Sequence, residues 1–454
     1  MDKQRKANII LINCDDLGYG DLGCYGSLVN ATPYIDALAA EGLRMTDFTM
    51  ASPVCSPSRG AMLTGCYPPR IGFGSFDGNV VLFPGDGLGL STSETTIADV
   101  LSRAGYDTML VGKWHCGDQE PFLPTNHGFA HYYGLPYSND MGKQKNRVDS
   151  YCPLPLMEDA SVIQQQPDLA GLTERYTERA IRFLRQEREG PFFLYMAHMY
   201  VHLPHYAPSR FVAESANGDF GAAVACLDWS VGALLHELKA LGLEEDTLVV
   251  FTSDNGGRGA EGGSNAPLRG AKGSTWEGGQ RVPCIFRWPG QIDAGVSSEL
   301  CCSLDFFRTF AALAGAEVPA GVAEDSLDLT VFLTGETELS PRESFFYYRG
   351  NSLDAVRCGR WKLKIADWDT PMACLFDLVA DPGESVNLWD AYPEVVADLS
   401  ARLDACRADL GDARTGVRGT GVREIGRVDS PRLLVEYDAN HPFMVAEYDR
   451  EERG

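Results

Sequence analysis

The stretch of sequence with the clearest chemical potential runs from Ala51 to Gly65 and contains Cys55, Pro57 and Arg59. A proline suited to a first helical turn, followed by ordinary helix formers, predicts a helix that begins at Cys55. Free backbone N–H groups at a helix N-terminus attract anions, and the planar guanidinium of Arg59 can bind a tetrahedral oxyanion. The stretch therefore predicts a site that holds an anion against Cys55.

Two roles for Cys55 follow from its residue type and position. It could be a small buried hydrophobic residue, which is the usual state of a cysteine in a cytosolic protein. It could also be a thiolate nucleophile whose pKa is lowered by the helix N-terminus and by Arg59. The stretch alone leaves both roles open.

Adjacent metal-binding side chains follow two apolar runs of the sequence. Asp15 and Asp16 come after one run, and Asp254 and Asn255 come after another. Carboxylate and amide oxygens are the ligands that calcium and magnesium prefer, so these pairs predict a divalent-cation site. The alternative is that each pair only caps a local turn.

Basic side chains occupy comparable positions. Lys113 and His115 follow a third apolar run, His202 lies in a histidine-rich segment after a fourth, and Lys272 lies in a glycine-rich run where the backbone can approach an anion. Taken singly, Lys113 would be interpreted as a surface lysine and His115 as a core histidine. Ligands bind beyond the carboxyl ends of parallel strands, so the repeated placement predicts one shared site.

The segment 116–167 is rich in Pro, Gly, Asn and aromatic residues without periodicity, and we interpret it as loops over the site. Asn139 and Asp140 lie within it. Loops of this kind commonly carry substrate contacts, so both are candidate substrate-binding residues, with an ordinary folded surface loop as the alternative.

Hydrophobic patterning predicts the elements that must position these groups. Strands are expected at 8–13, 106–111, 192–197, 247–252 and 282–288, and helices at 32–42, from 55 onward, and at 95–104, 172–189, 220–241 and 305–314. Buried strands that alternate with helices predict an α/β fold, with a large, mostly parallel sheet covered by helices on both faces.

A second, smaller unit is expected after an acidic, turn-rich linker at 317–338. Short strands near 345–348, 355–357 and 361–365, followed by a helix at 392–410, predict an α+β domain with an antiparallel sheet. We therefore divide the chain into a catalytic domain, 1–335, and a C-terminal domain, 336–454. The charged, aromatic tail from Val417 has no assigned structure.

Composition limits the partners and the compartment. A net charge of −24 argues against nucleic acid or an anionic membrane as a partner. The 13 cysteines are odd in number and form no C-x-x-C pair, and no apolar run reaches the length of a membrane span. The apolar run near the N-terminus is too short for a signal peptide, so we expect a cytoplasmic protein, or a periplasmic or secreted one if a leader was removed.

The motif Cys55-x-Pro57-x-Arg59-Gly60 resembles the signature of the type I sulfatases, a family of the alkaline phosphatase superfamily. Further segments that resemble sulfatases follow in the same order along the chain, at 13–21, 112–115, 253–256, 270–279 and 375–388. The nearest similarity is to the arylsulfatase A and N-acetylgalactosamine-6-sulfatase groups, partly through residues 135–141. Several independent motifs in register make a chance match improbable.

The resemblance implies an alkaline phosphatase-like fold and hydrolysis of a sulfate ester, on a sugar or an aryl group, to the alcohol and inorganic sulfate. It implies that a formylglycine-generating maturation enzyme converts Cys55 to formylglycine, whose hydrate attacks sulfur. A calcium ion, or alternatively magnesium, would be bound by the modified residue and four others: Asp15, Asp16, Asp254 and Asn255.

The resemblance also implies roles for the basic residues. Arg59 would orient and stabilise the hydrate, and His115 would help to eliminate sulfate. Sulfate would be bound by Lys113, His202 and Lys272, with His202 or Lys272 assisting the leaving group. The segment departs from the frequent Pro-His-x-Pro form, so His205 is an alternative to His202.

Two other functions remain open at this stage. One is a phosphonate or phosphate ester hydrolase of the same superfamily, although Asn255 after Asp254, in place of a histidine, favours sulfate. The other is a non-catalytic protein that only binds anionic ligands, against which the intact set of basic residues argues.

Overall fold

The computed structural model of the chain describes residues 6–143, 152–368 and 370–436. Part of the segment expected as loops at 116–167 and the last residues of the C-terminal tail lie outside this description.

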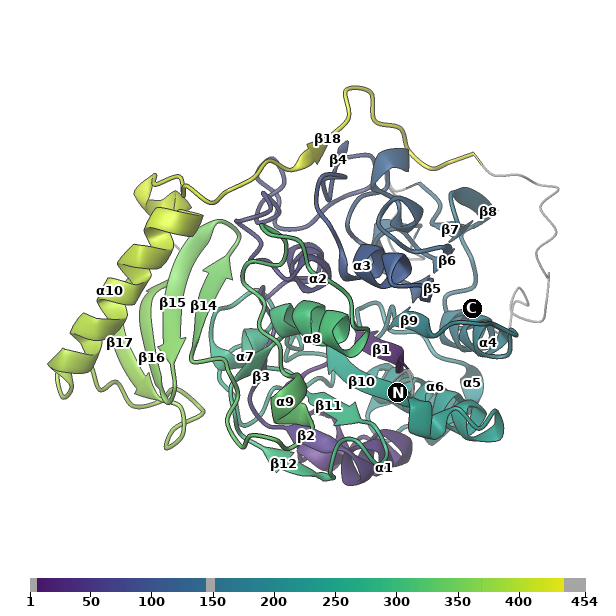
Figure 1. The fold of residues 1–454 in the computed structure, drawn as a ribbon, viewed down its shortest axis with the longest axis horizontal. Coiled ribbons are helices and arrows are strands. Elements are labelled where there is room, and N and C mark those ends of the chain that lie inside the picture. The colour runs from purple at the N-terminus through teal and green to yellow at the C-terminus, as the bar shows by residue number, and fades with distance from the viewer. Residues whose placement is uncertain (1–5, 144–151, 369, 437–454) are drawn as a thin grey trace.

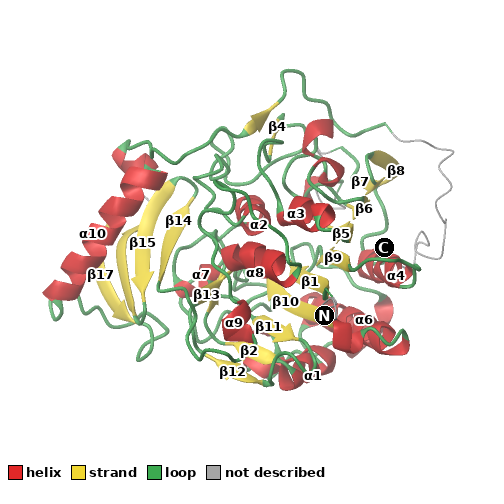
Figure 2. Ribbon diagram, in the orientation of Figure 1, coloured by secondary structure: helices red, strands yellow, loops and turns green. Residues whose placement is uncertain are grey.

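A ten-stranded sheet forms the centre of the larger part of the molecule (Figures 1 and 2), with the strand order β12-β2-β11-β10-β1-β9-β5-β6-β7-β8. Its middle consists of four parallel neighbours, which are β10 (Thr247–Ser253), β1 (Asn8–Cys14), β9 (Phe192–Ala197) and β5 (Asp107–Gly112). Their side chains are almost all buried, as expected for apolar strands that are covered on both faces.

The edges of this sheet are mixed. On one side lie β11 (Cys284–Arg287), β2 (Leu43–Met45) and β12 (Gly295–Ser297), and on the other lie β6 (His131–Gly134), β7 (Pro155–Glu158) and β8 (Ser161–Gln165). The expectation that 116–167 forms only loops is therefore wrong. Its strands have four or five residues and are held by pairing with β5 and with one another, so their own sequence shows no clear period.

Two helical layers cover the sheet, and alternate residues of β1 face them. Ile10 and Ile12 pack in one core with residues of α1 (Pro33–Glu41), α4 (Leu172–Leu184) and α6 (Gly218–Ala240). Ile9 and Leu11 pack in the other core, with residues of these helices: α2 (Cys55–Thr64), α3 (Ile97–Arg103), α8 (Phe306–Leu313) and α9 (Thr330–Leu333). Two further short helices in this part of the molecule are α5 (Ser209–Glu214) and α7 (Glu277–Gln280).

Helix α3 begins at Ile97, two residues after the start expected from the sequence. Its N-cap is Thr96, whose hydroxyl accepts from Asp99 N at 3.2 Å, while the Asp99 carboxylate accepts from Thr96 N at 2.8 Å. This reciprocal capping box fixes the helix start more strongly than the residues before it.

A separate four-stranded antiparallel sheet lies beside the larger part of the molecule (left in Figure 1). Its strands are β14 (Ser344–Arg349), β15 (Ser352–Cys358), β16 (Trp361–Asp367) and β17 (Thr370–Asp377), and α10 (Pro393–Leu410) packs against it. The first three strands and the helix confirm the expected α+β unit, whereas β17 was not expected as a strand. The domain boundary at residue 335 stays a prediction.

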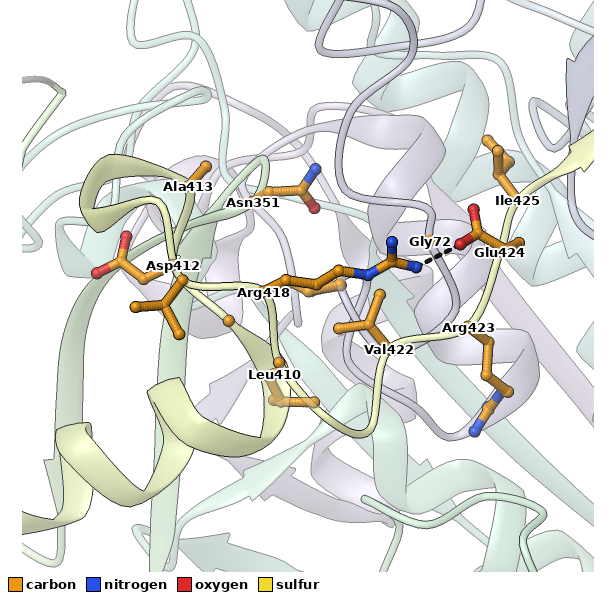
Figure 3. A pocket seen from close by; sticks show the side chains of 14 residues that line it. Gly72, Asn351, Leu410, Asp412, Ala413, Arg418, Val422, Arg423, Glu424 and Ile425 are labelled. Carbon is orange, nitrogen blue, oxygen red and sulfur yellow. Dashed lines mark hydrogen bonds and ion pairs between the residues drawn. The ribbon is translucent and has the colours of Figure 1, made fainter.

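After α10 the chain returns across the larger part of the molecule, as the yellow segment at the top of Figure 1 shows. In this returning segment, β18 (Gly426–Arg427) pairs with β4 (Leu88–Gly89). Elsewhere in the larger part of the molecule, another short pair joins β3 (Phe48–Thr49) to β13 (Cys301–Cys302). The returning segment also borders a pocket in which Arg418 forms an ion pair with Glu424 (Figure 3). The described part of the tail that sequence patterning left unassigned therefore runs from α10 to β4 of the larger part of the molecule.

Among the described residues, α6 alone has the length and composition of a membrane-spanning helix, and 61% of its most apolar window is buried inside the molecule. Its apolar residues Val224, Leu227 and Leu234 belong to the core beneath the central sheet.

Candidate active site

The central parallel strands place predicted site residues together at their carboxyl ends. Asp15 follows β1, Lys113 follows β5 and Asp254 follows β10. Backbone hydrogen bonds continue past the strand ends, with Asp254 N donating to Cys14 O at 2.9 Å and Lys113 N donating to Ala197 O at 2.7 Å. These side chains therefore start from backbone that the sheet itself holds in place.

Cys55 is the first residue of α2 and is buried, with 1% of its surface exposed. Its Sγ lies 3.4 Å from Asp15 Oδ1 and 3.5 Å from Lys272 Nζ. Burial and the Asp15 carboxylate raise the pKa of the Cys55 thiol, and they outweigh the opposite effects of Lys113 and Lys272. The environment therefore argues against an unmodified Cys55 thiolate as nucleophile.

Arg59 is fully buried one turn into α2. Its Nε donates to Asp254 Oδ2 at 2.8 Å, its Nη1 donates to Lys113 O at 2.8 Å, and its Nη2 lies 3.8 Å from Asp15 Oδ2. Ser58, the preceding residue, donates its hydroxyl to Asp254 O. Arg59 is thus held rigidly between the ends of three strands.

The lysines pair with the two adjacent aspartates. Lys113 Nζ donates to Asp15 Oδ2, and Lys272 Nζ lies 2.7 Å from Asp16 Oδ1. Burial lowers the pKa of each lysine, but the neighbouring carboxylates outweigh it and the net shift is upward. Both amines therefore stay protonated at neutral pH.

The carboxylates of Asp15 and Asp254 differ in pKa. Burial raises the pKa of Asp15, but the charges of Lys113 and Arg59 outweigh this effect and lower the pKa well below its usual range. Burial and the charge of Asp15 raise the pKa of Asp254 to about 6. Burial thus acts on both acids, and the nearby cations decide the net direction.

Of the two candidate histidines, the structure brings His202 to this cluster. Its Nε2 lies 3.8 Å from Asp16 Oδ2, whereas the ring of His205 packs edge-on against Phe220 at a centroid distance of 5.3 Å. Burial and the charge of Lys272 lower the pKa of His202, so the ring favours its neutral form.

His115 is also buried near Lys113, and burial and that lysine hold its pKa well below the usual value. Its Nε2 lies 3.0 Å from Leu82 O. A carbonyl oxygen only accepts hydrogen bonds, so Nε2 carries the proton and Nδ1 keeps its lone pair. Within the described part of the chain, Nδ1 has no hydrogen-bond partner, which leaves its lone pair able to accept a hydrogen bond.

The loop contacts Asn139 and Asp140 lie in a short 3-10 helix, Asn139–Met141, next to the turn that carries His202. The Asn139 amide is buried and donates to Pro204 O at 3.0 Å. The neighbouring Ser138, which sequence reasoning missed, accepts from Lys113 Nζ at 2.8 Å. Ser138 directly precedes the predicted substrate-binding residues Asn139 and Asp140, and this position was the signal that could have identified it.

The donor set fits a divalent cation. Ligand atoms of four residues lie within 4.8 Å of one another: Asp15, Asp16, Cys55 and His202. Asn255 is fully buried, its Nδ2 donates to Asp16 Oδ1 at 2.9 Å, and among the described residues its Oδ1 has no donor. A buried amide oxygen without a donor beside carboxylates suits a hard cation, which satisfies oxygen lone pairs.

Comparison with known proteins identifies related sequences along the chain. A family profile described as Sulfatase matches residues 7–316, and one described as N-sulphoglucosamine sulphohydrolase, C-terminal, matches residues 271–409. The chain is 40% identical to arylsulfatase A of Homo sapiens, over 95% of this chain and 92% of the relative. It is 39% identical to N-acetylgalactosamine-6-sulfatase of Rattus norvegicus, over 80% and 72% of the two chains.

Among solved structures, the crystal structure of Ps i-CgsB in complex with k-i-k-neocarrahexaose is similar, with a TM-score of 0.80 and 31% identity. The match covers 92% of this chain and 96% of that chain. Arylsulfatase A and this structure each match more than nine tenths of the chain, so the similarity includes both sheets.

Proposed function

This chain belongs to the sulfatase family and hydrolyses sulfate esters, and we propose that the residues gathered around Cys55 carry out this reaction on a sugar sulfate or an aryl sulfate. The observation that carries the proposal is the position of Cys55. It begins a helix, it is buried, and it lies within 3.5 Å of a buried aspartate and a partly buried lysine.

Two groups would complete the site. Conversion of Cys55 to formylglycine by a formylglycine-generating maturation enzyme would supply a hydrated aldehyde as the nucleophile. Calcium, or alternatively magnesium, would supply Lewis-acid polarisation of sulfate oxygens, and it would be held by position 55 and by Asp15, Asp16, Asp254 and Asn255. The buried oxygens of these four residues, including the Asn255 Oδ1 without a donor, support this set.

The remaining polar residues bind, orient and move protons. Arg59 fixes the start of α2, and with it position 55, against the strand ends through its hydrogen bonds to Asp254 and to the carbonyl of Lys113. Lys113 and Lys272, which stay protonated, bind sulfate oxygens and offset the charge that develops on them. These two amines also lower the cost of bringing an anionic substrate to a strongly acidic protein.

The histidines have separate roles in this proposal. His115 is neutral, its Nδ1 can accept a proton, and it assists elimination of sulfate. His202, or Lys272 beside it, assists departure of the alcohol. Asn139 and Asp140 would contact that alcohol, since their 3-10 helix is tied to the His202 turn through Pro204.

The test is peptide mass spectrometry across Cys55 in protein produced with its maturation enzyme. We expect an aldehyde at this position and loss of activity in Cys55→Ala, whereas Cys226→Ala, a buried cysteine in α6, should remain active. Fully active protein that carries an unmodified Cys55 would overturn the proposal. Separately, activity measured on a panel of sulfated sugars and aryl sulfates would distinguish the two substrate classes.

A further inference from the structure

The loop that carries Lys272 is fixed at the active site by its own backbone. Lys272 N donates to Gly257 O at 3.0 Å, and Gly273 N donates to Pro53 O at 2.9 Å. These bonds join the loop to the segment after β10 and to the residues just before α2. The position of the Lys272 amine therefore depends on where this loop, residues 269–277, is held.

Side chains of the C-terminal sheet form hydrogen bonds with this loop at Thr275. The Thr275 hydroxyl donates to Asp354 Oδ2 at 2.9 Å and accepts from Lys364 Nζ, and the Thr275 carbonyl accepts from Lys362 Nζ at 2.9 Å. Asp354 lies on β15, and both lysines lie on β16. One residue, three positions after Lys272, thus contacts three side chains of the other sheet.

The next residues of the loop are held as well. Trp276 Nε1 donates to Asp367 Oδ2 at 3.1 Å, and Glu277 N donates to Glu384 Oε2 at 2.7 Å. On the other side of Lys272, Arg269 donates to Glu384 O at 2.9 Å and lies 3.7 Å from the centre of the Trp276 ring. Both ends of the loop are therefore fastened to the segment around Glu384.

A buried charge cluster lies at the centre of this contact. Lys362 Nζ lies 2.9 Å from Glu277 Oε1 and 2.8 Å from Glu384 Oε1, and all three side chains are fully buried. Tyr347 OH donates to the same oxygen of Glu277 at 2.7 Å. Desolvation offsets much of the attraction in a buried ion pair, so the net stabilisation from such a cluster is small. Here the cluster holds Glu277, at the end of the loop, against Lys362 of β16.

We propose that Lys362 and Glu384 are positioning residues for catalysis, which hold the loop 269–277 so that the amine of Lys272 lies against Asp16 and position 55. The two sheets then act as one catalytic unit, and the C-terminal sheet contributes to the reaction without touching the substrate. This inference rests on the role of Lys272 in the proposed function.

A double-mutant cycle with Lys362→Met and Lys272→Met tests this role. A displacement of about 1 Å at a catalytic group can cost about 10²-fold, so we expect Lys362→Met to lower kcat/KM by roughly that factor. In the Lys272→Met background, the same substitution should lower kcat/KM by less than about twofold, because it acts through a side chain already removed. An equal factor in both backgrounds would overturn the proposal.

The matched control is Arg287→Met. Arg287 is a buried cation on β11 that pairs with Glu41 and Glu244. In the sheet it lies opposite Val249, near the start of β10 and therefore away from Asp254, which follows the end of that strand. Its effect on kcat/KM should be small and the same in both Lys272 backgrounds. This control separates a general loss of stability from a loss of loop position.

Two further measurements keep the test decisive. If Lys362→Met does not fold, Thr275→Val removes only the hydroxyl that joins Asp354 and Lys364, and the same cycle applies to it. Hydrogen exchange at Gly273 N should accelerate in either variant and stay unchanged in Arg287→Met, and unchanged exchange in all three would overturn the inference. If Lys272→Met alone leaves kcat/KM unchanged, the assigned role of Lys272 fails, while exchange at Gly273 still decides whether the loop is held.

Discussion

Lys272 and Cys55 are 217 positions apart in the sequence, yet the lysine Nζ lies 3.5 Å from the cysteine Sγ. The same amine is 2.7 Å from Asp16, which follows β1. A helix start, a strand end and a loop held by the second sheet therefore meet at one point. The reaction chemistry depends on how well each of these three elements is held.

Replacement of Lys272 by methionine should remove one cation from the substrate site and leave most of the fold intact. Loss of a single group that stabilises developing negative charge typically costs about 10²- to 10³-fold in kcat. We expect a decrease of that size for a sulfate ester, measured by steady-state kinetics, with little change in melting temperature. Lys239→Met, at an exposed position on α6, is the control and should keep full activity. Wild-type kcat in Lys272→Met would contradict the assigned role.

The strand ends of the site could be predicted from the sequence because their signal is local. An apolar run such as 8–13 has to be buried, and polar residues directly after it, such as Asp15, have to lie at the sheet edge. The start of α2 at Cys55 was predictable for the same reason. The choice between His202 and His205 was not, because it depends on the path of a turn and not on a pattern.

The grip of the C-terminal sheet on the Lys272 loop could not be predicted. Lys362 and Lys364 alternate with apolar residues on β16, a pattern that normally places lysines in solvent, yet both are fully buried. Their burial depends on acceptors in a distant loop and at Glu384. The strands β6, β7 and β8 were missed for a related reason, since short edge strands are stabilised by their neighbours more than by their own residues.

The burial of Lys364 predicts a pH dependence of stability. Burial and the charge of Lys362 lower its pKa from 10.5 to about 8, although Asp354, Asp367 and Glu384 act in the opposite direction. Between these two pH values the unfolded chain binds more protons at this residue than the folded chain does. The contribution of Lys364 to the free energy of unfolding therefore increases as pH rises from about 8 to about 10.5.

Denaturant unfolding of the wild type and of Lys364→Met across this pH range measures that contribution. The difference in unfolding free energy between the two proteins should shift in favour of the wild type as pH rises through the window. Lys239→Met, in which an exposed lysine is changed, should follow the wild-type pH profile. A constant difference between the wild type and Lys364→Met would show that Lys364 has an ordinary pKa in the folded protein.

The assignment of His115 as a proton acceptor predicts a selective loss in His115→Ala. Its neutral ring offers Nδ1 while Nε2 is bound to Leu82 O. General acid–base groups typically contribute 10²- to 10⁴-fold, so we expect kcat to fall by about that range. Because elimination of sulfate follows departure of the alcohol, a slower elimination also lowers KM and leaves kcat/KM nearly unchanged, which steady-state kinetics can measure. A rise in KM with unchanged kcat would indicate that His115 only binds the substrate.

If Asn255 is one of the cation ligands, Asn255→Leu should weaken calcium binding, although the three proposed carboxylate ligands remain. The substitution removes the amide oxygen that has no donor, and it also removes the hydrogen bond from Nδ2 to Asp16. Because a ligand that binds only the folded chain stabilises it in proportion to the logarithm of its concentration, calcium should raise the melting temperature of the wild type. In Asn255→Leu the same rise should require a higher calcium concentration.

This measurement is made on chelator-treated protein titrated with calcium and, separately, with magnesium, so it requires neither substrate nor turnover. Asn8→Leu serves as the matched control, because its amide is also buried but bonds to Thr247 and Phe192 at the opposite end of the central strands. It should lower the melting temperature at every calcium concentration and leave the calcium dependence unchanged. Equal calcium dependence in the wild type and Asn255→Leu would exclude Asn255 from the ligand set, since a lost ligand has to weaken the binding of the ion it held.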